Sequence, residues 1–216
     1  MVGKLVVSLI WVFWIFVIDS TAEGQNVSVD YNPSYSTTYD RVKARGYVIC
    51  GTNDEFPGFS QEHWSNEDGN KWTGFDVDIC RAIAAAIFGD AERIEFEVVN
   101  GKTRFTYLID GTIDVLSATT TFTYSRNVLK KLEFMPTTYY DGQGFIVRKT
   151  LGVSSAKQME GARICFSSTG TGAKNIADFM KLHGINYIPV AVPPTEKTKN
   201  VYKRGDCDMY GTDRSG

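Results

Sequence analysis

Short apolar runs alternate with helical patterns through the first half of the chain. A strand, a helix, a strand, a helix and a strand are predicted in this order at residues 47–52, 76–88, 94–99, 104–109 and 113–116. In the longer helix, Ile79, Ile83, Ala86 and Ile87 fall on one face, which predicts an amphipathic helix packed on a sheet. Strands that alternate with helices are typical of parallel βαβ units.

The second half repeats this plan after an interruption. Residues 141–144 break the alternation, and residues 145–147 form a brief extended piece that we interpret as part of a crossover between two lobes. Strands and helices are then predicted in turn at residues 163–166, 173–182, 187–190, 197–203 and 207–210. The pattern therefore predicts an α/β fold of two similar halves.

The strand predicted at 113–116 leads into a run of hydroxyl side chains that ends near a cation, Arg126. The hydroxyls are those of Ser117, Thr119, Thr120, Thr121 and Thr123. In open α/β sheets, ligands bind at the carboxyl ends of the strands. Hydroxyls and a guanidinium gathered there can hold a small anion, most simply a carboxylate. A solvated loop with an unrelated arginine is the alternative, and we favour the pocket because a buried strand directs the segment to the ligand edge of the sheet.

The N-terminus has the features of a secretory signal. Lys4 gives a positive start, residues 5–18 form an apolar run of 14 residues interrupted by Ser8, and Ser20 and Ala22 fit a small-x-small cleavage site. A membrane span needs about 20 apolar residues. We therefore expect a cleaved signal peptide at 1–22, with an uncleaved anchor as the alternative.

Composition narrows the choice of partners. The formal net charge is −2 and acidic and basic residues are interspersed, so neither nucleic acid nor an anionic membrane surface is expected. Hydrophobic residues make up 43% of the chain, which is enough to build real cores. The length allows one large domain or two small α/β lobes.

Four cysteines in an exported chain suggest disulfides, and four cysteines allow three pairings. Pairing within each half, Cys50 with Cys80 and Cys165 with Cys207, is the simplest, and buried free thiols are the alternative. No Cys-x-x-Cys or Cys/His spacing indicates zinc. We therefore expect neither a metal nor a cofactor.

Two glycine-bearing loops resemble phosphate-binding motifs but are incomplete. Residues 101–103 (GKT) match the end of a P-loop, but Phe96 stands where the earlier glycine is required. Residues 169–172 (TGTG) open a helix as a dinucleotide loop does, but Asn175 occupies the third glycine position. The second loop still offers backbone N–H groups and a helix dipole to a small anion.

No catalytic residues are predicted. His63 and His183 lie in polar contexts typical of surface residues, and no Gly-x-Ser-x-Gly elbow is present. Asp76 and Asp78 are paired carboxylates at the start of the predicted helix at 76–88, where we interpret them as capping residues.

Aromatic residues gather between the first strand and the first helix. We interpret Phe56, Phe59, Trp64 and Trp72 mainly as packing under a long loop. Phe56 is the exception, because it lies in a polar turn just past the carboxyl end of the strand. An aromatic ring there could cover the aliphatic part of a ligand.

Five motifs occur in an order and at a spacing that resemble one protein family. They are VICGTNDEFPGFS, WTGFDVDICRAIAAAIFGD, GTIDVLSATTTFTYSR, YYDGQGFIVRK and GDCDMYGTD. Together they resemble family 3 of the bacterial extracellular solute-binding proteins, and within it the general L-amino-acid-binding proteins of polar amino acid ABC transporters. The resemblance covers residues 38–216, and the four cysteines stand at places that match this subgroup, which favours the pairing within each half.

The resemblance implies a two-lobed, type II periplasmic binding protein fold of the α/β class that closes on its ligand. We expect a flexible lead-in at 23–39 and a first lobe at 40–143. A hinge strand and part of the second lobe are expected at 144–216. Family members continue well beyond the position of Asp213, so the resemblance implies a C-terminally truncated member whose second lobe and return crossover are incomplete. An extended version is expected to be more stable and to bind more tightly.

The resemblance also implies a ligand site on the first lobe. Arg126 would grip the α-carboxylate of an amino acid through paired N–H bonds. Thr119 and Thr121 would support it through their hydroxyls, with the backbone of Ala118 nearby. Phe56 falls where the family places an aromatic ring over the ligand side chain.

The second lobe would supply the opposing groups. Asp213 would accept the α-ammonium group, and Thr171 would help to hold the carboxylate at the start of a helix. The family usually reads Gly-Thr-Thr and an acidic residue here, whereas residues 169–173 read TGTGA, so the capping loop differs.

These residues imply a periplasmic protein that captures L-amino acids and passes them to an inner-membrane ABC permease, acting as a monomer. One alternative is an enzyme on the same fold, such as a dehydratase or a murein-active enzyme, which would need an acid–base pair that the motifs do not supply. The other is a non-transport amino acid sensor with the same pocket, which the sequence does not separate from a transport protein.

Overall fold

The computed structural model describes residues 37–65 and 69–215. The signal peptide predicted at 1–22 and most of the lead-in predicted at 23–39 lie outside the described residues. The end of that lead-in is helical, because α1 spans Thr38–Arg45. Among the described residues, no helix has the length and apolar character needed to cross a membrane.

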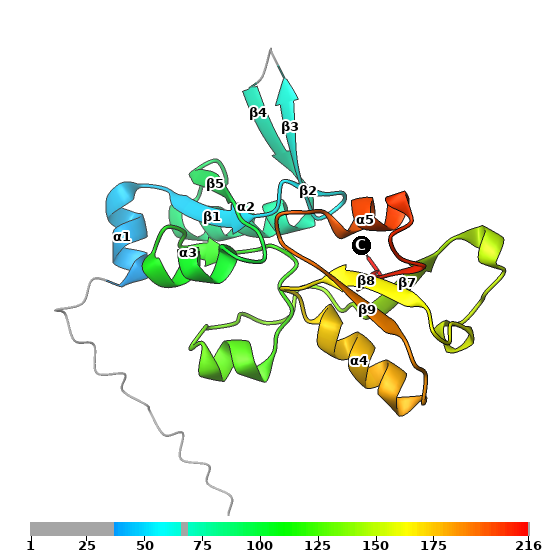
Figure 1. The fold of residues 1–216 in the computed structure, drawn as a ribbon. Helices are drawn as coiled ribbons and strands as arrows, with labels where there is room; N and C mark the ends of the chain where they lie inside the picture. Colours follow the sequence, from blue (N-terminus) through cyan, green and yellow to red (C-terminus); the bar gives the residue numbers. More distant parts are fainter. Residues whose placement is uncertain (1–36, 66–68, 216) are drawn as a thin grey trace, which may run out of the picture. The chain divides into compact units, whose positions relative to one another are not determined.

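The first half folds around a three-stranded parallel sheet in the order β5-β1-β6, drawn in blue and green in Figure 1. The strands are β1 (Val48–Thr52), β5 (Ile94–Val98) and β6 (Val115–Leu116), and the connecting helices are α2 (Phe75–Phe88) and α3 (Arg104–Asp110). The predicted parallel βαβ units are therefore present. The segments that follow the strands leave from one edge of the sheet.

A three-stranded antiparallel meander separates β1 from α2. It consists of β2 (Glu55–Phe56), β3 (Ser60–Ser65) and β4 (Gly69–Thr73), so the prediction of a long loop here was wrong. The strand pairing was missed because its residues are mostly polar and lack the alternation of a half-buried strand. Trp72 is 8% exposed and stacks on Phe96 with ring centroids 5.3 Å apart.

The turn from the meander into α2 requires glycine. Gly74 has a φ of +124°, and a Cβ atom there would lie 2.4 Å from the carbonyl oxygen of Phe59. Gly74 precedes α2 without a side-chain cap, and the backbone N–H of Asp76 donates to that same Phe59 carbonyl at 2.8 Å. The close approach therefore fixes the start of α2 against the meander.

The second half contains a four-stranded mixed sheet in the order β7-β10-β8-β9, coloured from yellow-green to red in Figure 1. Its elements are β7 (Gln143–Val147), β8 (Arg163–Ser167), α4 (Gly172–Leu182), β9 (Ile188–Val192), α5 (Thr198–Arg204) and β10 (Met209–Asp213). β8 pairs in parallel with β9 and β10, whereas β7 pairs antiparallel with β10. Two short 3₁₀ turns, η2 (Lys149–Leu151) and η3 (Ala156–Gln158), connect β7 to β8.

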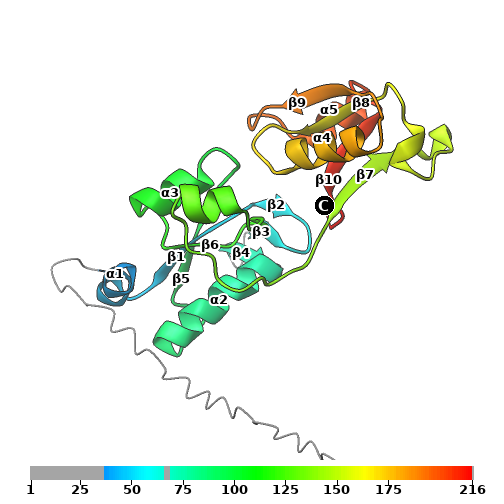
Figure 2. The same cartoon turned by 90° about the horizontal axis from the view of Figure 1, so that it is seen from below.

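Each half has its own hydrophobic core. In the first half, Val48 of β1 packs with Ala84 of α2, a helix that lies beside β1 in Figure 2. In the second half, Ile164, Ile176 and Met209 are fully buried in one cluster. The α/β class predicted for both halves is confirmed by these separate cores and sheets.

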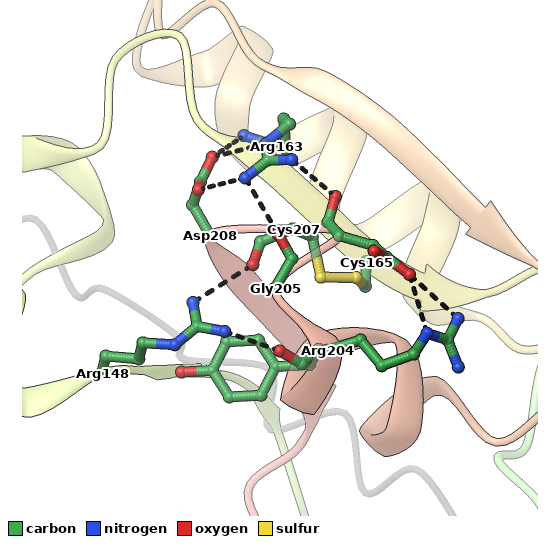
Figure 3. The surroundings of a disulfide bond; sticks show 9 residues. Arg148, Arg163, Cys165, Arg204, Gly205, Cys207 and Asp208 are labelled. Carbon is green, nitrogen blue, oxygen red and sulfur yellow. Dashed lines mark hydrogen bonds and ion pairs between the residues drawn. A yellow bond between two sulfur atoms is a disulfide. The ribbon is translucent and has the colours of Figure 1, made fainter.

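One disulfide links elements within each half. Cys50 of β1 bonds to Cys80 of α2, and Cys165 of β8 bonds to Cys207, which precedes β10 (Figure 3). This is the pairing that the sequence favours. All four cysteines are fully buried, so each bond joins a central strand to a neighbouring element inside a core.

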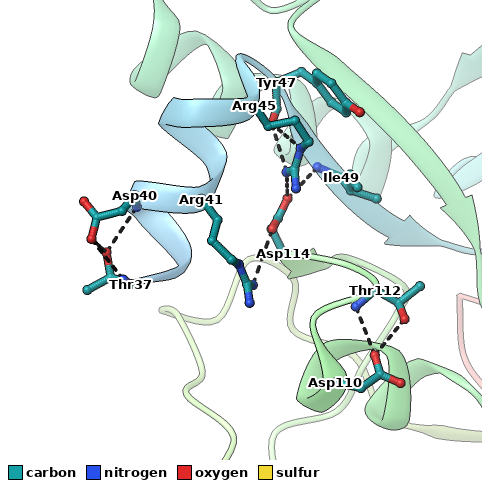
Figure 4. A network of polar contacts seen from close by, with 9 residues as sticks. All are labelled: Thr37, Asp40, Arg41, Arg45, Tyr47, Ile49, Asp110, Thr112 and Asp114. Atoms are coloured by element: carbon teal, nitrogen blue, oxygen red, sulfur yellow. Dashed lines mark hydrogen bonds and ion pairs between the residues drawn. The ribbon is translucent and has the colours of Figure 1, made fainter. Parts of the chain in front are cut away.

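An aspartate holds the start of a strand in each half. Asp114 accepts hydrogen bonds from the backbone N–H of Ile49 at 2.8 Å and from Arg45 (Figure 4). Asp208 accepts from the backbone N–H of Arg163 at 2.9 Å and from its guanidinium at 2.8 Å (Figure 3). The pKa of Asp208 is lowered by these bonds to Arg163.

These aspartates explain why β6 and β10 start two residues later than predicted. At Asp114 and Asp208 a side-chain carboxylate accepts the N–H of the neighbouring strand. The regular ladder begins only beyond that point, at Val115 and Met209. The repeated arrangement supports the expectation that the two halves share one plan.

We expect Asp114→Ala to lower the free energy of unfolding by about 3 kcal/mol. The Asp114 side chain is 1% exposed, so its loss leaves the Ile49 N–H and the Arg45 guanidinium with less compensation. Urea titration monitored by circular dichroism measures the change. Asp110→Ala is the matched control, because Asp110 is exposed and its side-chain hydrogen bonds within the described residues are local ones from Thr112 (Figure 4). Equal destabilisation by the two variants would contradict the role of Asp114.

Candidate functional site

The hydroxyl-rich segment leaves the sheet at the end of β6. The Ser117 N–H donates to the Gly51 carbonyl of β1 at 3.0 Å, which is the last link to the central strand. Ala118 is then 2% exposed, and its carbonyl accepts a hydrogen bond from the Thr120 hydroxyl at 3.1 Å. Thr119 adopts a left-handed φ of +44°, which is unusual for a β-branched residue. The segment is thus a tightly folded turn at the ligand edge of the sheet.

Asp76 fixes this turn from the first turn of α2. Its carboxylate accepts hydrogen bonds from the Ser117 hydroxyl and from the Thr119 backbone N–H, each at 2.9 Å. The interpretation of Asp76 as a capping residue was wrong, since no side chain caps α2. Burial raises the pKa of Asp76, and the two hydrogen bonds oppose that shift. Asp78, in contrast, points to solvent with a side chain that is 73% exposed.

Arg126 lies on a short π-helix, η1 (Ser125–Leu129), that follows the turn. The residue is 6% exposed, and its Nη1 donates to the Thr121 carbonyl at 2.6 Å. Its guanidinium also lies over the ring of Phe105, with Cζ 5.1 Å from the centroid. Burial lowers the pKa of Arg126, and the charge of Asp213 opposes that shift.

Arg104, the first residue of α3, is a second cation near Arg126. Burial lowers the pKa of Arg104 to about 10, with a further decrease caused by Arg126 and an opposing effect of Asp213. Its Nε is buried without a hydrogen-bond partner among the described residues. Arg104 was missed as a site residue because the sequence pattern marks it only as the start of a helix. The available signal in the sequence was a cation at the start of α3, the helix that precedes β6 and the hydroxyl run.

Asp213 is the last residue of β10 and pairs in register with Gln143 of β7. Burial is the largest cause of its raised pKa, and Asp141 raises it further. Arg104 and Arg126 lower the same pKa. Among the described residues, neither arginine has a carboxylate oxygen within 4.0 Å. The two cations and Asp213 therefore influence each other without forming a direct ion pair.

A surface hollow of about 490 Å³ lies beside Asp213. It is lined by Gln143, Gly144, Phe145, Ile146, Ala156, Thr212, Asp213 and Arg214. All of these residues come from the second half, and Arg126 is not among them. The candidate site is therefore defined by the charges of Arg104, Arg126 and Asp213, and the hollow borders it only at Asp213.

Two further contacts join residues of the two halves. Lys197 forms an ion pair with Glu55 of β2, which lowers the pKa of Glu55. Gly101 lies so close to Thr169 that a Cβ atom at position 101 would be 2.0 Å from the Thr169 Oγ1. The two glycine-bearing loops that fail as phosphate motifs thus lie against each other.

Phe56 and Thr171 are the remaining predicted site residues. Phe56 is half-buried with its ring 5.4 Å from that of Phe59, which in turn contacts Tyr139 at 5.1 Å. Thr171 precedes α4 with a helical φ of −79°, and its side chain does not cap the helix. In the described part of the chain, no hydrogen bond or cation–π contact joins Phe56 or Thr171 to Arg126. Their ligand roles stay predictions, as do those of Ala118, Thr119, Thr121, Arg126 and Asp213.

No group of three or more His, Cys, Asp or Glu side chains that could hold a metal ion occurs among the described residues. The charged groups that influence one another here are the guanidiniums of Arg104 and Arg126 and the carboxylate of Asp213, with Asp141 acting on Asp213 as well. Such a set suits a ligand that carries both an anionic and a cationic group.

The chain belongs to family 3 of the bacterial extracellular solute-binding proteins, whose family model matches residues 48–208. It is 44% identical over 190 residues to the general L-amino acid-binding periplasmic protein AapJ of Rhizobium johnstonii, covering 88% of this chain and 54% of that protein. It is 42% identical to the glutamate/glutamine/aspartate/asparagine-binding protein BztA of Rhodobacter capsulatus, covering 84% of this chain and 52% of that one.

A solved structure confirms the fold. A periplasmic binding protein of an ABC transporter from Brucella ovis, with glutathione bound, matches with a TM-score of 0.77 and 40% identity. The match covers 83% of this chain and 56% of that one. The predicted family and the type II periplasmic binding protein fold are both confirmed. The chain spans about half the length of the relatives it matches.

We expect Asp213→Asn to raise the unfolding midpoint of the unliganded protein at pH 7. A raised pKa means that the ionised carboxylate disfavours the folded state above that pKa, whereas below the unfolded pKa both states are protonated. The difference between variant and wild type should therefore shrink as the pH falls through the raised pKa. Thermal unfolding followed by circular dichroism between pH 7 and pH 3 measures it.

The control for this prediction is Asp178→Asn, which removes an exposed acid that pairs with Lys174 on α4. It should leave the midpoint unchanged or slightly lower. A lower midpoint for Asp213→Asn at pH 7 would show that burial of the Asp213 charge is not unfavourable.

Proposed function

We propose that this protein binds L-amino acids, gripping the α-carboxylate with Arg126 and the α-ammonium group with Asp213. The observation that carries the proposal is the buried guanidinium of Arg126, which has no carboxylate partner among the described residues but interacts with the charge of Asp213. A zwitterion between the two groups supplies an anion to Arg126 and a cation to Asp213. Both desolvated charges of the protein are then compensated at once.

The turn at 117–121 supports this assignment on the anion side. The Thr121 carbonyl holds Nη1 of Arg126, which leaves the other N–H groups of the guanidinium fork for a carboxylate. The Thr119 hydroxyl oxygen lies 3.4 Å from the Nδ2 donor of Asn53, so its own hydrogen is available to an anion. The predicted hydroxyl support from Thr119 and Thr121 is compatible with this arrangement.

Arg104 suggests a preference among amino acids. It adds a second desolvated guanidinium beside Arg126, with a buried Nε that lacks a partner among the described residues. A ligand with a side-chain carboxylate or amide oxygen offers an acceptor for it. The relative BztA carries glutamate, glutamine, aspartate and asparagine in its name. We therefore propose polar amino acids, and acidic ones in particular, as the ligand class.

We further propose that the protein acts as a monomeric, periplasmic capture protein for an inner-membrane ABC permease, exported by a signal peptide that is cleaved. The family membership and the periplasmic relatives support this. The proposed architecture keeps a first lobe at 40–143 and a hinge strand with part of a second lobe at 144–216. We do not assign an enzymatic activity, since the site residues are explained by ligand charge alone. A sensor with the same pocket would differ in its partner and not in its ligand.

Arg126→Ala is expected to weaken L-glutamate binding by about 100-fold or more, because two charge-assisted hydrogen bonds to the α-carboxylate are lost. Arg126→Lys should bind with intermediate affinity, since it keeps the charge but loses the planar fork. Isothermal titration calorimetry on folded protein measures both.

Lys130→Ala is the matched control for Arg126→Ala. Lys130 is an exposed cation just after η1 and lies 5.6 Å from the same Phe105 ring. Its removal should change the affinity by no more than about threefold. Unchanged binding by folded Arg126→Ala would overturn the assignment.

Arg104→Met is expected to reduce the preference for L-glutamate over L-glutamine by about tenfold, because a side-chain carboxylate loses a charged donor whereas an amide loses a weaker one. The ratio of the two dissociation constants, measured by calorimetry in wild type and variant, tests this. An unchanged ratio would show that Arg104 does not contact the ligand side chain.

A further inference from the structure

Asp76 is a buried carboxylate that the proposed ligand contacts do not use. The residue is 5% exposed and lies in the first turn of α2. A buried carboxylate is costly unless hydrogen bonds compensate it. Both side-chain bonds of Asp76 go to the turn after β6, from the Ser117 hydroxyl and the Thr119 N–H, each at 2.9 Å. The carboxylate therefore connects α2 with the segment that leads to Arg126.

The conformation of this turn needs support from outside. Thr119 has a φ of +44°, a left-handed conformation that is disfavoured for a β-branched side chain. Its N–H points to Asp76 and not to a strand or helix partner. Without this acceptor, a partly buried N–H would lose its hydrogen bond, and the left-handed conformation of Thr119 would no longer be compensated.

The same bonds divide the hydroxyl-rich segment into two roles. The Ser117 hydroxyl and the Thr119 N–H both donate to Asp76, so neither can donate to the carboxylate of a ligand. Asp76 does not use the hydroxyl of Thr119 or the carbonyl of Thr121, which accept hydrogen bonds from Asn53 and Arg126, so these groups stay with the site. Ser117, singled out in the sequence with the other hydroxyls, is thus structural.

We propose that Asp76 is a positioning residue, which holds the turn at 117–121 in the conformation that presents Thr119 and Arg126 to the carboxylate of the ligand. This inference rests on the proposed function for its ligand, but the hydrogen bonds that carry it are independent of any ligand. It predicts that the shape of the Asp76 side chain matters more than its charge.

Two variants separate shape from charge. In Asp76→Asn, the amide oxygen accepts from the Thr119 N–H and the amide nitrogen donates to the Ser117 hydroxyl, so both contacts are kept. In Asp76→Leu, a side chain of similar size leaves both donors unsatisfied. We expect L-glutamate affinity within about threefold of wild type for Asp76→Asn and about tenfold or more weaker for Asp76→Leu. Calorimetry on variants shown to be folded by circular dichroism measures both.

Asp78→Leu is the matched control. It replaces an aspartate by leucine two residues further along α2, at a side chain that is 73% exposed. This variant should alter the affinity by no more than about twofold. An equal loss in Asp78→Leu, or wild-type affinity in folded Asp76→Leu, would overturn the positioning role.

A second measurement needs neither ligand nor variant. The Thr119 amide lies outside the helices and strands, yet its bond to Asp76 should protect it from hydrogen exchange in the wild-type protein. Rapid exchange of this amide would overturn the inference even if Asp76→Leu failed to fold. If the wild type binds neither L-glutamate nor L-glutamine, the proposed function fails, and protection of the Thr119 amide still decides the role of Asp76.

Discussion

Burial of the Arg126 guanidinium organises the candidate site. The residue is 6% exposed, and within the described part of the chain its side chain donates to the Thr121 carbonyl and to no carboxylate. A cation removed from water without a counter-charge is costly, and the lowered pKa reflects that cost. Asp213 partly offsets it from the other half of the chain, while its own pKa is raised by burial. A zwitterionic ligand can compensate two desolvated charges of opposite sign that do not form a direct ion pair.

The two halves of the chain that carry Arg126 and Asp213 are stabilised by the same kinds of contact. In each half an aspartate accepts an N–H of the neighbouring strand at the start of β6 or β10, and a disulfide joins a central strand to the element beside it. The aspartate contacts lie at the opposite end of the strands from the site residues, whereas Cys50 and Cys165 lie in the middle of β1 and β8. The aspartates at the starts of the strands therefore stabilise the fold, and residues at the carboxyl ends of the strands recognise the ligand, as is usual for α/β folds. Changes in the aspartates should affect folding, and changes at Arg126 or Asp213 should affect binding.

Much of this was predictable from the sequence because both halves show strong periodicity. Outside the meander β2-β3-β4, the strands and helices from 48 to 116 and from 163 to 213 fall within a few residues of the predicted ones. The errors at β6 and β10 come from aspartates whose carboxylates accept an N–H of the neighbouring strand. The meander β2-β3-β4 was missed because its strands are polar and short. The helix α1 was missed although Thr37 and Asp40 form a capping box, since its apolar face is small.

The candidate site was predictable only in part. Arg126 and its hydroxyl neighbours follow directly from a strand that ends in a polar run. Asp76 and Arg104 were not found, because their roles depend on burial and on contacts between distant segments. A carboxylate at the start of a helix is read from sequence as a cap. Its contact with a turn 41 to 43 residues away is a property of the fold.

In the proposed site, Arg126 and Asp213 grip the α-carboxylate and the α-ammonium group of one ligand. Competition or direct calorimetry with three compounds tests it without any substitution in the protein. These are L-glutamate, glutarate, which lacks the ammonium group, and γ-aminobutyrate, which lacks the α-carboxylate. We expect L-glutamate to bind and each analogue to bind at least about 100-fold more weakly, because one buried charge of the protein is left uncompensated. Equal affinity for either analogue would contradict it.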